Sequence, residues 1–137
     1  SALSALIGSV LGGARTFTST SSQGLFLMYE NLPIVSGMNL PAVMVVANRS
    51  VSAPLSIWND HSDAMSARDQ GWIQIYCESS QETIDEIIKA YKLSEHPEIQ
   101  TPVMVNIDGF TLTHLYEPVD IPSSKEISSF FEDCQIR

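Results

Sequence analysis

Residues 41–47 read Pro-Ala-Val-Met-Val-Val-Ala, and residues 102–107 read Pro-Val-Met-Val-Asn-Ile. Each stretch is a short apolar run rich in valine, which is typical of a β-strand buried on both faces of a sheet. Between them, residues 81–93 are predicted to form a helix, with acidic residues near its start and lysines near its end. Buried strands that alternate with helices predict an α/β fold, in which a parallel sheet is flanked by helices.

The alternation extends to both sides of these stretches. Residues 1–11 carry leucine, isoleucine and valine at helical spacing and read as the middle of a helix that has no cap. The start of the chain does not read as a signal peptide. Because the helix opens on the first residue without a cap, we expect the chain to be a piece of a longer protein, incomplete at its N-terminus. The other predicted elements are short strands over 15–19 and 72–77, and helices that begin near residue 25, run from 60 to about 69, and lie near 127–131.

The chain is long enough for one domain with its own core. It has 137 residues, of which 44% are hydrophobic and 17% charged, and this composition excludes a disordered tail. Residues 1–118 are predicted to form that domain. Residues 119–137 are polar and rich in serine, so we interpret them as a linker or as the start of a next domain.

Charge and cysteine content exclude several functions. Seven Lys and Arg residues against 16 Asp and Glu give a net charge of −9, which argues against a nucleic-acid partner. No apolar run approaches the about 18 residues of a membrane span. Two cysteines, Cys77 and Cys134, without a CxxC motif cannot by themselves hold an iron–sulfur cluster or a structural zinc. We interpret Cys77 as a core residue and predict a cytoplasmic protein.

Three polar clusters follow predicted strands, at residues 19–23, 48–50 and 108–110. In parallel α/β sheets, ligands bind outside the carboxyl ends of the strands, so these clusters are candidates for a binding site. Residues 1–59 contain a single acid, Glu30, and two cations, Arg15 and Arg49. A first half that is apolar and carries few charges suggests burial against other chains or domains.

Arg49 is the strongest single candidate for a ligand-binding residue, because it ends an apolar strand where no neighbour in the sequence neutralises its charge. A guanidinium at this place could bind a carboxylate through two parallel hydrogen bonds. The alternative is a structural ion pair with an acid such as Asp60. For Ser22 and Gln23, the alternatives are contact with a ligand and capping of the next helix.

The residues at 60–63, Asp-His-Ser-Asp, could form an acid–base or metal cluster. Metal sites need three or four convergent ligands, and nothing else in the sequence clearly supplies them. The alternative is a helix N-cap with a hydrogen-bonded histidine. A further alternative is that Asp60 and His61 only shape the wall of a binding cleft.

Four motifs together resemble the alpha subunit of pyruvate:ferredoxin oxidoreductases, in the 2-oxoacid:ferredoxin oxidoreductase superfamily. They occur in unbroken order within residues 1 to about 120, and they are specific for the superfamily but less so for pyruvate. The motifs are TFTSTSSQGL at 16–25, VVANRSVSAPLSIW at 45–58, DHSDAMSARDQGW at 60–72 and VMVNIDGF at 103–110.

This resemblance implies the pyrimidine-binding module of a thiamin-diphosphate enzyme. The implied reaction is the oxidative decarboxylation of pyruvate with CoA to acetyl-CoA and CO2, with electrons passing through iron–sulfur clusters to ferredoxin. Partner subunits or domains would hold the diphosphate, its Mg2+ and the clusters. The absence of a cluster motif in this chain agrees with that division.

The resemblance also assigns roles to residues. Arg49 matches the family arginine that binds the substrate carboxylate. The glutamate that hydrogen-bonds the pyrimidine would lie upstream of Ser1, so we expect no catalytic residue and no metal ligand in this chain. Ser22 and Gln23 are candidates for cofactor binding. Two alternatives stay open: a non-catalytic structural module of such a complex, and the same chemistry on another 2-oxo acid.

Overall fold

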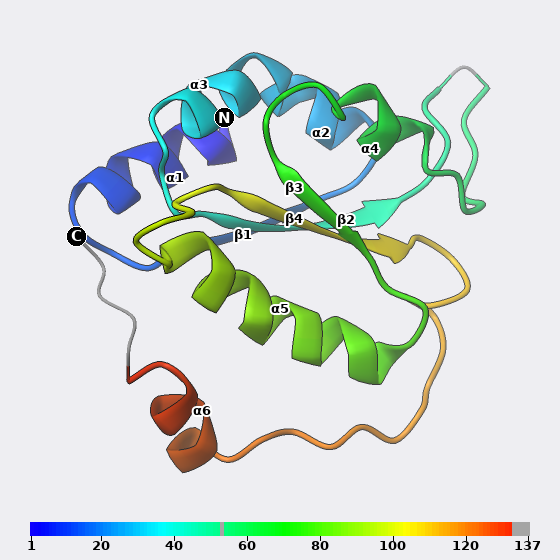
Figure 1. Ribbon diagram of the computed structural model, residues 1–137. Coiled ribbons are helices and arrows are strands. Elements are labelled where there is room, and N and C mark those ends of the chain that lie inside the picture. The colour runs from blue at the N-terminus through cyan, green and yellow to red at the C-terminus, as the bar shows by residue number, and fades with distance from the viewer. Residues whose placement is uncertain (53, 133–137) are drawn as a thin grey trace.

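The computed structural model describes residues 1–52 and 54–132, and it contains one parallel sheet (Figure 1). The four strands lie in the order β1-β2-β4-β3 and every neighbouring pair is parallel, as predicted. The apolar runs at 41–47 and 102–107 become the two central strands. The strands are β1 (Phe17–Thr20), β2 (Val43–Asn48), β3 (Ile73–Tyr76) and β4 (Val103–Asp108).

Side chains of the central strands alternate between two cores. Val43 pairs with Val103 and Met44 with Met104 across the β2–β4 ladder. Because successive side chains of a strand point to opposite faces, the methionines enter one core and these valines the other. Both faces are thereby covered, which is why these strands read as continuous apolar runs.

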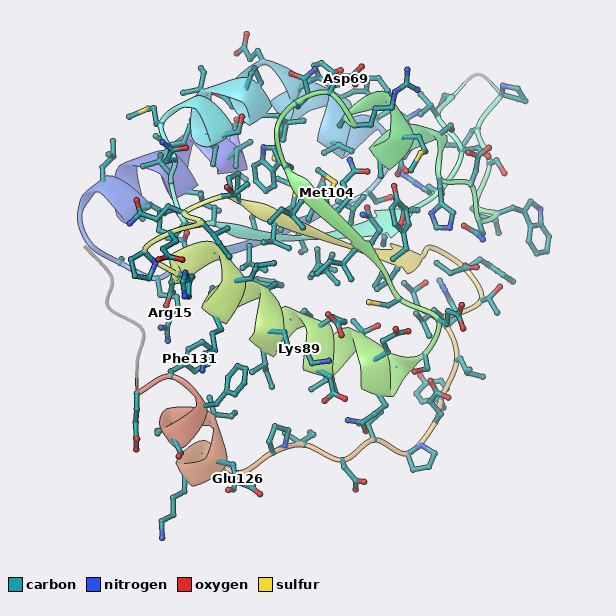
Figure 2. The ribbon with its side chains drawn as sticks, in the orientation of Figure 1. Arg15, Asp69, Lys89, Met104, Glu126 and Phe131 are labelled. Carbon is teal, nitrogen blue, oxygen red and sulfur yellow. The ribbon has the colours of Figure 1, made fainter. Side chains whose placement is uncertain are left out.

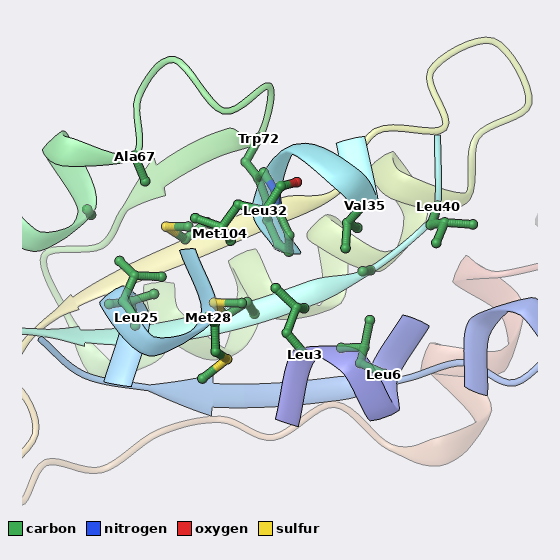
Figure 3. Close-up of a cluster of buried hydrophobic side chains, with 14 of the residues drawn as sticks. Leu3, Leu6, Leu25, Met28, Leu32, Val35, Leu40, Ala67, Trp72 and Met104 are labelled. Carbon is green, nitrogen blue, oxygen red and sulfur yellow. The ribbon is translucent and has the colours of Figure 1, made fainter. Parts of the chain in front are cut away.

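The methionine face is covered by the helices of the first half of the chain and by α4 (Figure 1). Figure 3 shows Met104 of β4 in the same cluster as Leu32 and Leu3 from the covering helices. Pro33 lies in the first turn of α3, where its missing N–H removes no helical hydrogen bond. The elements are α1 (Ala2–Leu11), α2 (Gln23–Met28), the 3-10 turn η1 (Tyr29–Asn31), α3 (Leu32–Gly37) and α4 (Ser62–Ser66).

The opposite face is covered by α5 (Ser80–Glu95), which lies below the sheet in Figure 1. The helix begins one residue before the predicted start at 81, because the Ser79 hydroxyl caps it and accepts a 3.1 Å hydrogen bond from the N–H of Glu82. It runs two residues past the predicted end at 93. His96 adopts an extended backbone there, as expected for a residue that precedes a proline.

Two expectations about helix ends are wrong. The first helix does have a cap, because Ser1 and Ser4 form a capping box at the start of α1. The helix expected to reach residue 69 ends at Ser66, where a hydrogen bond from the N–H of Gln70 to Ala67 begins a turn. Both differences concern hydrogen bonds that satisfy the helix ends, which apolar periodicity does not report.

The segment after residue 118 extends along α5 and leads to α6 (Ser124–Phe130) (Figure 1). Gln81 exchanges two hydrogen bonds with the backbone of Asp120, and the Lys92 ammonium donates to the carbonyl of Phe130 at 2.8 Å. Arg15 lies over the ring of Phe131, 4.6 Å from its centroid (Figure 2). Residues 133–137, with Cys134, lie outside the described part of the chain.

In residues 1–52 and 54–132, no helix is long and apolar enough to cross a membrane.

Candidate functional site

The carboxyl ends of the parallel strands bring the three polar clusters to one edge of the sheet, as the sequence predicts. The N–H of Gly109, after β4, donates a 2.8 Å hydrogen bond to the carbonyl of Asn48, the last residue of β2. The Ser22 hydroxyl, after β1, donates a 2.9 Å hydrogen bond to the carbonyl of Ser50. Three loops that are distant in the sequence thus form one continuous surface, the carboxyl edge of the sheet.

Asp63 lies at the centre of this edge and is fully buried. Its carboxylate accepts hydrogen bonds from the N–H of Ser22 (3.1 Å), the side-chain amide of Asn48 (2.8 Å), the N–H of Arg49 (3.3 Å) and the N–H of Ala64 (2.7 Å). None of the ion pairs in the described residues involves Asp63. Four N–H groups, rather than a cation, therefore stabilise this carboxylate.

Two buried asparagines continue the polar network beneath the edge. The Asn48 amide also lies 3.3 Å from the side-chain oxygen of Asn106, whose own amide donates to the carbonyl of Ile75 at 3.2 Å. The network thus joins α4, β2, β4 and β3. The sequence did not predict this arrangement, and its signal there is an asparagine within or at the end of an otherwise apolar strand.

Arg49 follows β2 directly and its side chain is half-buried. Its Nε atom is buried and has no hydrogen-bond partner among the described residues, and no ion pair there includes it. The predicted alternative, an ion pair with Asp60, is absent from the described residues. Asp60 instead accepts hydrogen bonds from the N–H of Ser62 (2.6 Å) and the hydroxyl of Ser50 (3.3 Å), and these bonds lower its pKa. Arg49 therefore keeps donor capacity for a ligand.

Ser22 and Gln23 connect the loops after β1 and β2. Ser22 is fully buried, with a φ of 42°, and its hydroxyl lies 2.8 Å from the Gln23 side-chain oxygen. The half-exposed Gln23 donates from its amide to the Ser52 hydroxyl at 2.6 Å. Ser22 occupies the N-cap position of α2, but its side chain makes no capping hydrogen bond. The capping alternative for Ser22 is therefore wrong.

His61 precedes α4 and packs edge-on against Tyr76, with ring centroids 5.1 Å apart. Its Nδ1 atom is buried without a partner in the described residues, so the predicted hydrogen-bonded histidine is not found. Burial raises the pKa of the Tyr76 hydroxyl, and the charge of Asp63 raises it further. His61, Cys77 and Asp108 help to line a pocket of about 180 Å³ at this edge. Within residues 1–52 and 54–132, no group of three acidic, histidine or cysteine residues could hold a metal ion.

Aromatic side chains flank the same edge. The exposed Trp58 lies against Phe110, with centroids 4.6 Å apart, and Phe110 stacks on His114 at 5.4 Å. Trp72, in contrast, belongs to the core and donates its indole N–H to the carbonyl of Leu32. Cys77 is buried, as predicted, and burial raises the pKa of its thiol to about 11.

A family model matches nearly the whole chain. Residues 1–136 match the model described as pyruvate flavodoxin/ferredoxin oxidoreductase, thiamine diphosphate-binding. The chain therefore belongs to the thiamine diphosphate-binding domain family of the pyruvate flavodoxin/ferredoxin oxidoreductases. The resemblance drawn from the four motifs is confirmed.

Individual relatives agree with this family. The chain is 59% identical over 130 residues, 95% of its length, to pyruvate synthase subunit PorA of Methanocaldococcus jannaschii, of which it covers 33%. It is 42% identical over 136 residues, 99% of its length, to the alpha subunit of an NADH-dependent phenylglyoxylate dehydrogenase of Aromatoleum evansii, of which it also covers 33%. The chain thus spans about a third of the length of the curated relatives it matches.

A solved structure shows the same fold. The 2-oxoglutarate:ferredoxin oxidoreductase of Magnetococcus marinus, with 2-oxoglutarate, coenzyme A and succinyl-CoA bound, superposes with a TM-score of 0.69 and 26% identity. The match covers 78% of this chain and 19% of that chain.

The carboxyl edge fits a polar cofactor such as thiamin diphosphate. Among the described residues, four buried side-chain polar atoms lack a hydrogen-bond partner. Three of these atoms, Asn48 Oδ1, Arg49 Nε and His61 Nδ1, belong to residues at this edge. Unpartnered donors and acceptors are rare in native structures and require an explanation. Arg49 and His61 are half-buried, so a bound polar group would supply partners for their side chains, whereas Asn48 is fully buried.

Proposed function

We propose that this chain is the part of a pyruvate:ferredoxin oxidoreductase that binds the substrate carboxylate and the pyrimidine end of thiamin diphosphate. The whole enzyme would oxidatively decarboxylate pyruvate with CoA to acetyl-CoA and CO2 and pass the electrons to ferredoxin. The observation that carries this proposal is the position of Arg49. It is a cation at the carboxyl edge of a parallel sheet, with no ion pair in the described residues.

Arg49 supplies a fixed positive charge for the carboxylate of a 2-oxo acid. The planar guanidinium can donate two parallel hydrogen bonds to it, which fixes both the position and the orientation of the substrate. The keto carbon is thereby held for attack, and such positioning contributes directly to the rate. When the carboxylate leaves as neutral CO2, the charge attraction to Arg49 ends, so the product is not retained.

Thiamin diphosphate, when bound, supplies the carbanion that attacks the keto carbon and stabilises the charge left by decarboxylation. Gln23 is half-exposed at the carboxyl edge and would face the pyrimidine end. Ser22 supports it from below through the 2.8 Å contact between their side chains. Glu30, the only acid of the first 59 residues, is exposed on η1. The family resemblance places the pyrimidine-binding glutamate upstream of Ser1, and Glu30 does not match it, so we assign that glutamate to a part of the enzyme outside residues 1–137.

The remaining groups are assigned to partner subunits or domains. With two cysteines in all, this chain cannot provide the four thiolates of an iron–sulfur cluster. The clusters, the diphosphate and its Mg2+ would therefore be held elsewhere in the complex. Residues 1–118 would form the cofactor-binding domain, and 119–137 would lead from it along α5. The buried free thiol of Cys77 is compatible with a reducing compartment, so we propose a cytoplasmic enzyme.

Pyruvate is the proposed substrate because the relatives named as pyruvate synthase subunits are more similar to this chain than the phenylglyoxylate enzyme is. Their identities are 59% and 51%, against 42%. The same site chemistry would serve any 2-oxo acid, since Arg49 contacts only the carboxylate. The assay is CoA-dependent reduction of a low-potential dye by the complete enzyme, with pyruvate, 2-oxoglutarate and phenylglyoxylate compared. A preference for either of the last two would reject pyruvate as the substrate but keep the reaction class.

Replacement of Arg49 tests the proposed role. In the assembled enzyme, Arg49→Ala should raise KM for the 2-oxo acid and cost about 2–4 kcal/mol in kcat/KM. Arg68→Ala is the matched control, because Arg68 is exposed and its ion pair in the described residues is with the exposed Asp69, at 3.7 Å. If the chain were a purely structural module, Arg49→Ala would change assembly on size exclusion and leave kcat/KM of the assembled enzyme unchanged.

A further inference from the structure

The burial of Asp63 requires a physical explanation. A buried carboxylate loses most of its hydration, and this cost is offset only by strong hydrogen bonds or a cation. Asp63 is fully buried and relies on N–H groups alone within the described residues. Two of the groups that stabilise it are the main chain of Arg49 and the side chain of the residue before it. The carboxylate is therefore bound to the strand end that carries the proposed substrate ligand.

The two carboxylate oxygens of Asp63 accept hydrogen bonds from different segments of the chain. Oδ1 accepts from the Asn48 amide at 2.8 Å, which anchors the last residue of β2. Oδ2 accepts from the N–H of Arg49 at 3.3 Å and from the N–H of Ser22 at 3.1 Å. One carboxylate thus fixes the root of the Arg49 side chain against both the strand and the loop after β1.

Ser22 adds a second indication of the same constraint. Its φ of 42° lies in the left-handed region, which is unfavourable for a residue that has a Cβ. The hydrogen bond to Asp63 and the bond from its hydroxyl to Ser50 hold it in that conformation. Since Ser50 follows Arg49, Arg49 is held on both sides by contacts that involve Ser22 or Asp63.

We propose that Asp63 is a positioning residue that holds the backbone of Arg49 so that the guanidinium meets the substrate carboxylate. The inference rests on the proposed role of Arg49. A carboxylate suits this position because it offers only acceptors to four converging donors. An asparagine of the same shape would turn an NH2 group towards N–H donors, lose at least one hydrogen bond, and free the loop.

The test compares variants in the assembled enzyme. Asp63→Asn is made in the native background and in the Arg49→Ala background. Asp69→Asn serves as the control, because Asp69 is exposed and its ion pair in the described residues is with the exposed Arg68. For each variant, kcat, KM for pyruvate, KM for CoA and the thermal midpoint are measured. We expect Asp63→Asn to raise KM for pyruvate about tenfold, with KM for CoA unchanged, since one charge-assisted contact is misplaced. In the Arg49→Ala background the same change should add less than about twofold, because Asp63 acts through Arg49.

Each contrary outcome has a distinct meaning. If Asp63→Asn lowers the thermal midpoint but leaves KM for pyruvate of the assembled enzyme unchanged, Asp63 is only structural and the proposal is overturned. An equal rise in both backgrounds would also overturn it, because Asp63 would then act independently of Arg49. If Arg49→Ala itself leaves KM unchanged, the proposed function of Arg49 fails, and the positioning role fails with it.

A second variant covers the case in which Asp63→Asn does not assemble. Asn48→Ala removes the 2.8 Å bond to Oδ1 and leaves the other three donors in place. A rise of about threefold in KM for pyruvate, absent in the Arg49→Ala background, would support the proposal. No change in KM for pyruvate would overturn it.

Discussion

The N–H of Gly109 donates a 2.8 Å hydrogen bond to the carbonyl of Asn48, which joins the ends of the two central strands. The approach is so close that only a residue without a side chain fits at position 109, because a Cβ there would collide with the Asn48 carbonyl. Asn48 in turn donates to Asp63 and precedes Arg49. The glycine that directly follows β4 thus contacts the end of the strand that leads to Arg49.

The first prediction concerns this contact. Gly109→Ala should destabilise the chain by about 2–3 kcal/mol, since the new methyl group forces the strand ends apart. Urea unfolding, followed through the fluorescence of the buried Trp72, measures the change. Gly8→Ala is the control: nothing lies within 4 Å of the added methyl, and alanine favours the helix by up to about 1 kcal/mol. Equal stability of the two variants would contradict the predicted collision.

A second prediction concerns the ion pair between Arg15, which precedes β1, and Glu95, the last residue of α5. It lies at the amino ends of the strands, opposite the carboxyl edge. Arg15 donates two parallel hydrogen bonds of 2.6 Å to Glu95, whose side chain is 2% exposed. Arg15→Ala leaves this buried carboxylate without its guanidinium and should cost about 3 kcal/mol in urea unfolding. Arg68→Ala, at an exposed pair of 3.7 Å, should cost less than about 0.5 kcal/mol. A similar loss for both variants would show that the burial of Glu95 has no effect.

The third prediction concerns pH. Burial raises the pKa of the Cys77 thiol from 9.0 to about 11. Between these two pH values the thiol is mostly protonated in the folded chain and mostly ionised in the unfolded chain. Above pH 9 the unfolded state therefore binds fewer protons than the folded state, and the contribution of Cys77 to stability falls as the pH rises to about 11. Cys77→Ala should remove this part of the pH dependence.

The same raised pKa makes Cys77 unreactive at neutral pH, because the thiolate is the nucleophile. In a Cys134→Ser background, iodoacetamide should label folded protein much more slowly than urea-unfolded protein at pH 8. Equal labelling rates in the two states would contradict the predicted protection.

A fourth prediction separates charge from geometry at Arg49. Arg49→Lys keeps the positive charge but loses the planar fork that donates two parallel hydrogen bonds. We expect a loss in kcat/KM for pyruvate of about tenfold, smaller than for Arg49→Ala. Steady-state kinetics on the assembled enzyme measure it, with Arg68→Lys as the control. If lysine restored full activity, charge alone would suffice and two parallel hydrogen bonds would not be needed.

Much of the fold could be predicted because strands and helices depend on neighbouring residues. The valine-rich runs at 41–47 and 102–107 became the two central strands, and the acidic start and lysine-bearing end of 81–93 predicted α5. The convergence of three polar clusters also followed, since parallel strands end at one edge. The cap of α1 and the early end of α4 were missed because they depend on individual hydrogen bonds.

The sequence by itself determined that this chain forms a parallel α/β sheet with Arg49 at a strand end, and it placed the chain in its family through four ordered motifs. Only the tertiary structure decided the role of Asp63, which the sequence offered as part of a cap or a metal cluster. Its donors Asn48 and Ser22 lie 15 and 41 residues away along the chain. Apolar periodicity is a property of consecutive residues, whereas the partners of a buried carboxylate are set by strand order and register. Those contacts exist only after the sheet has formed.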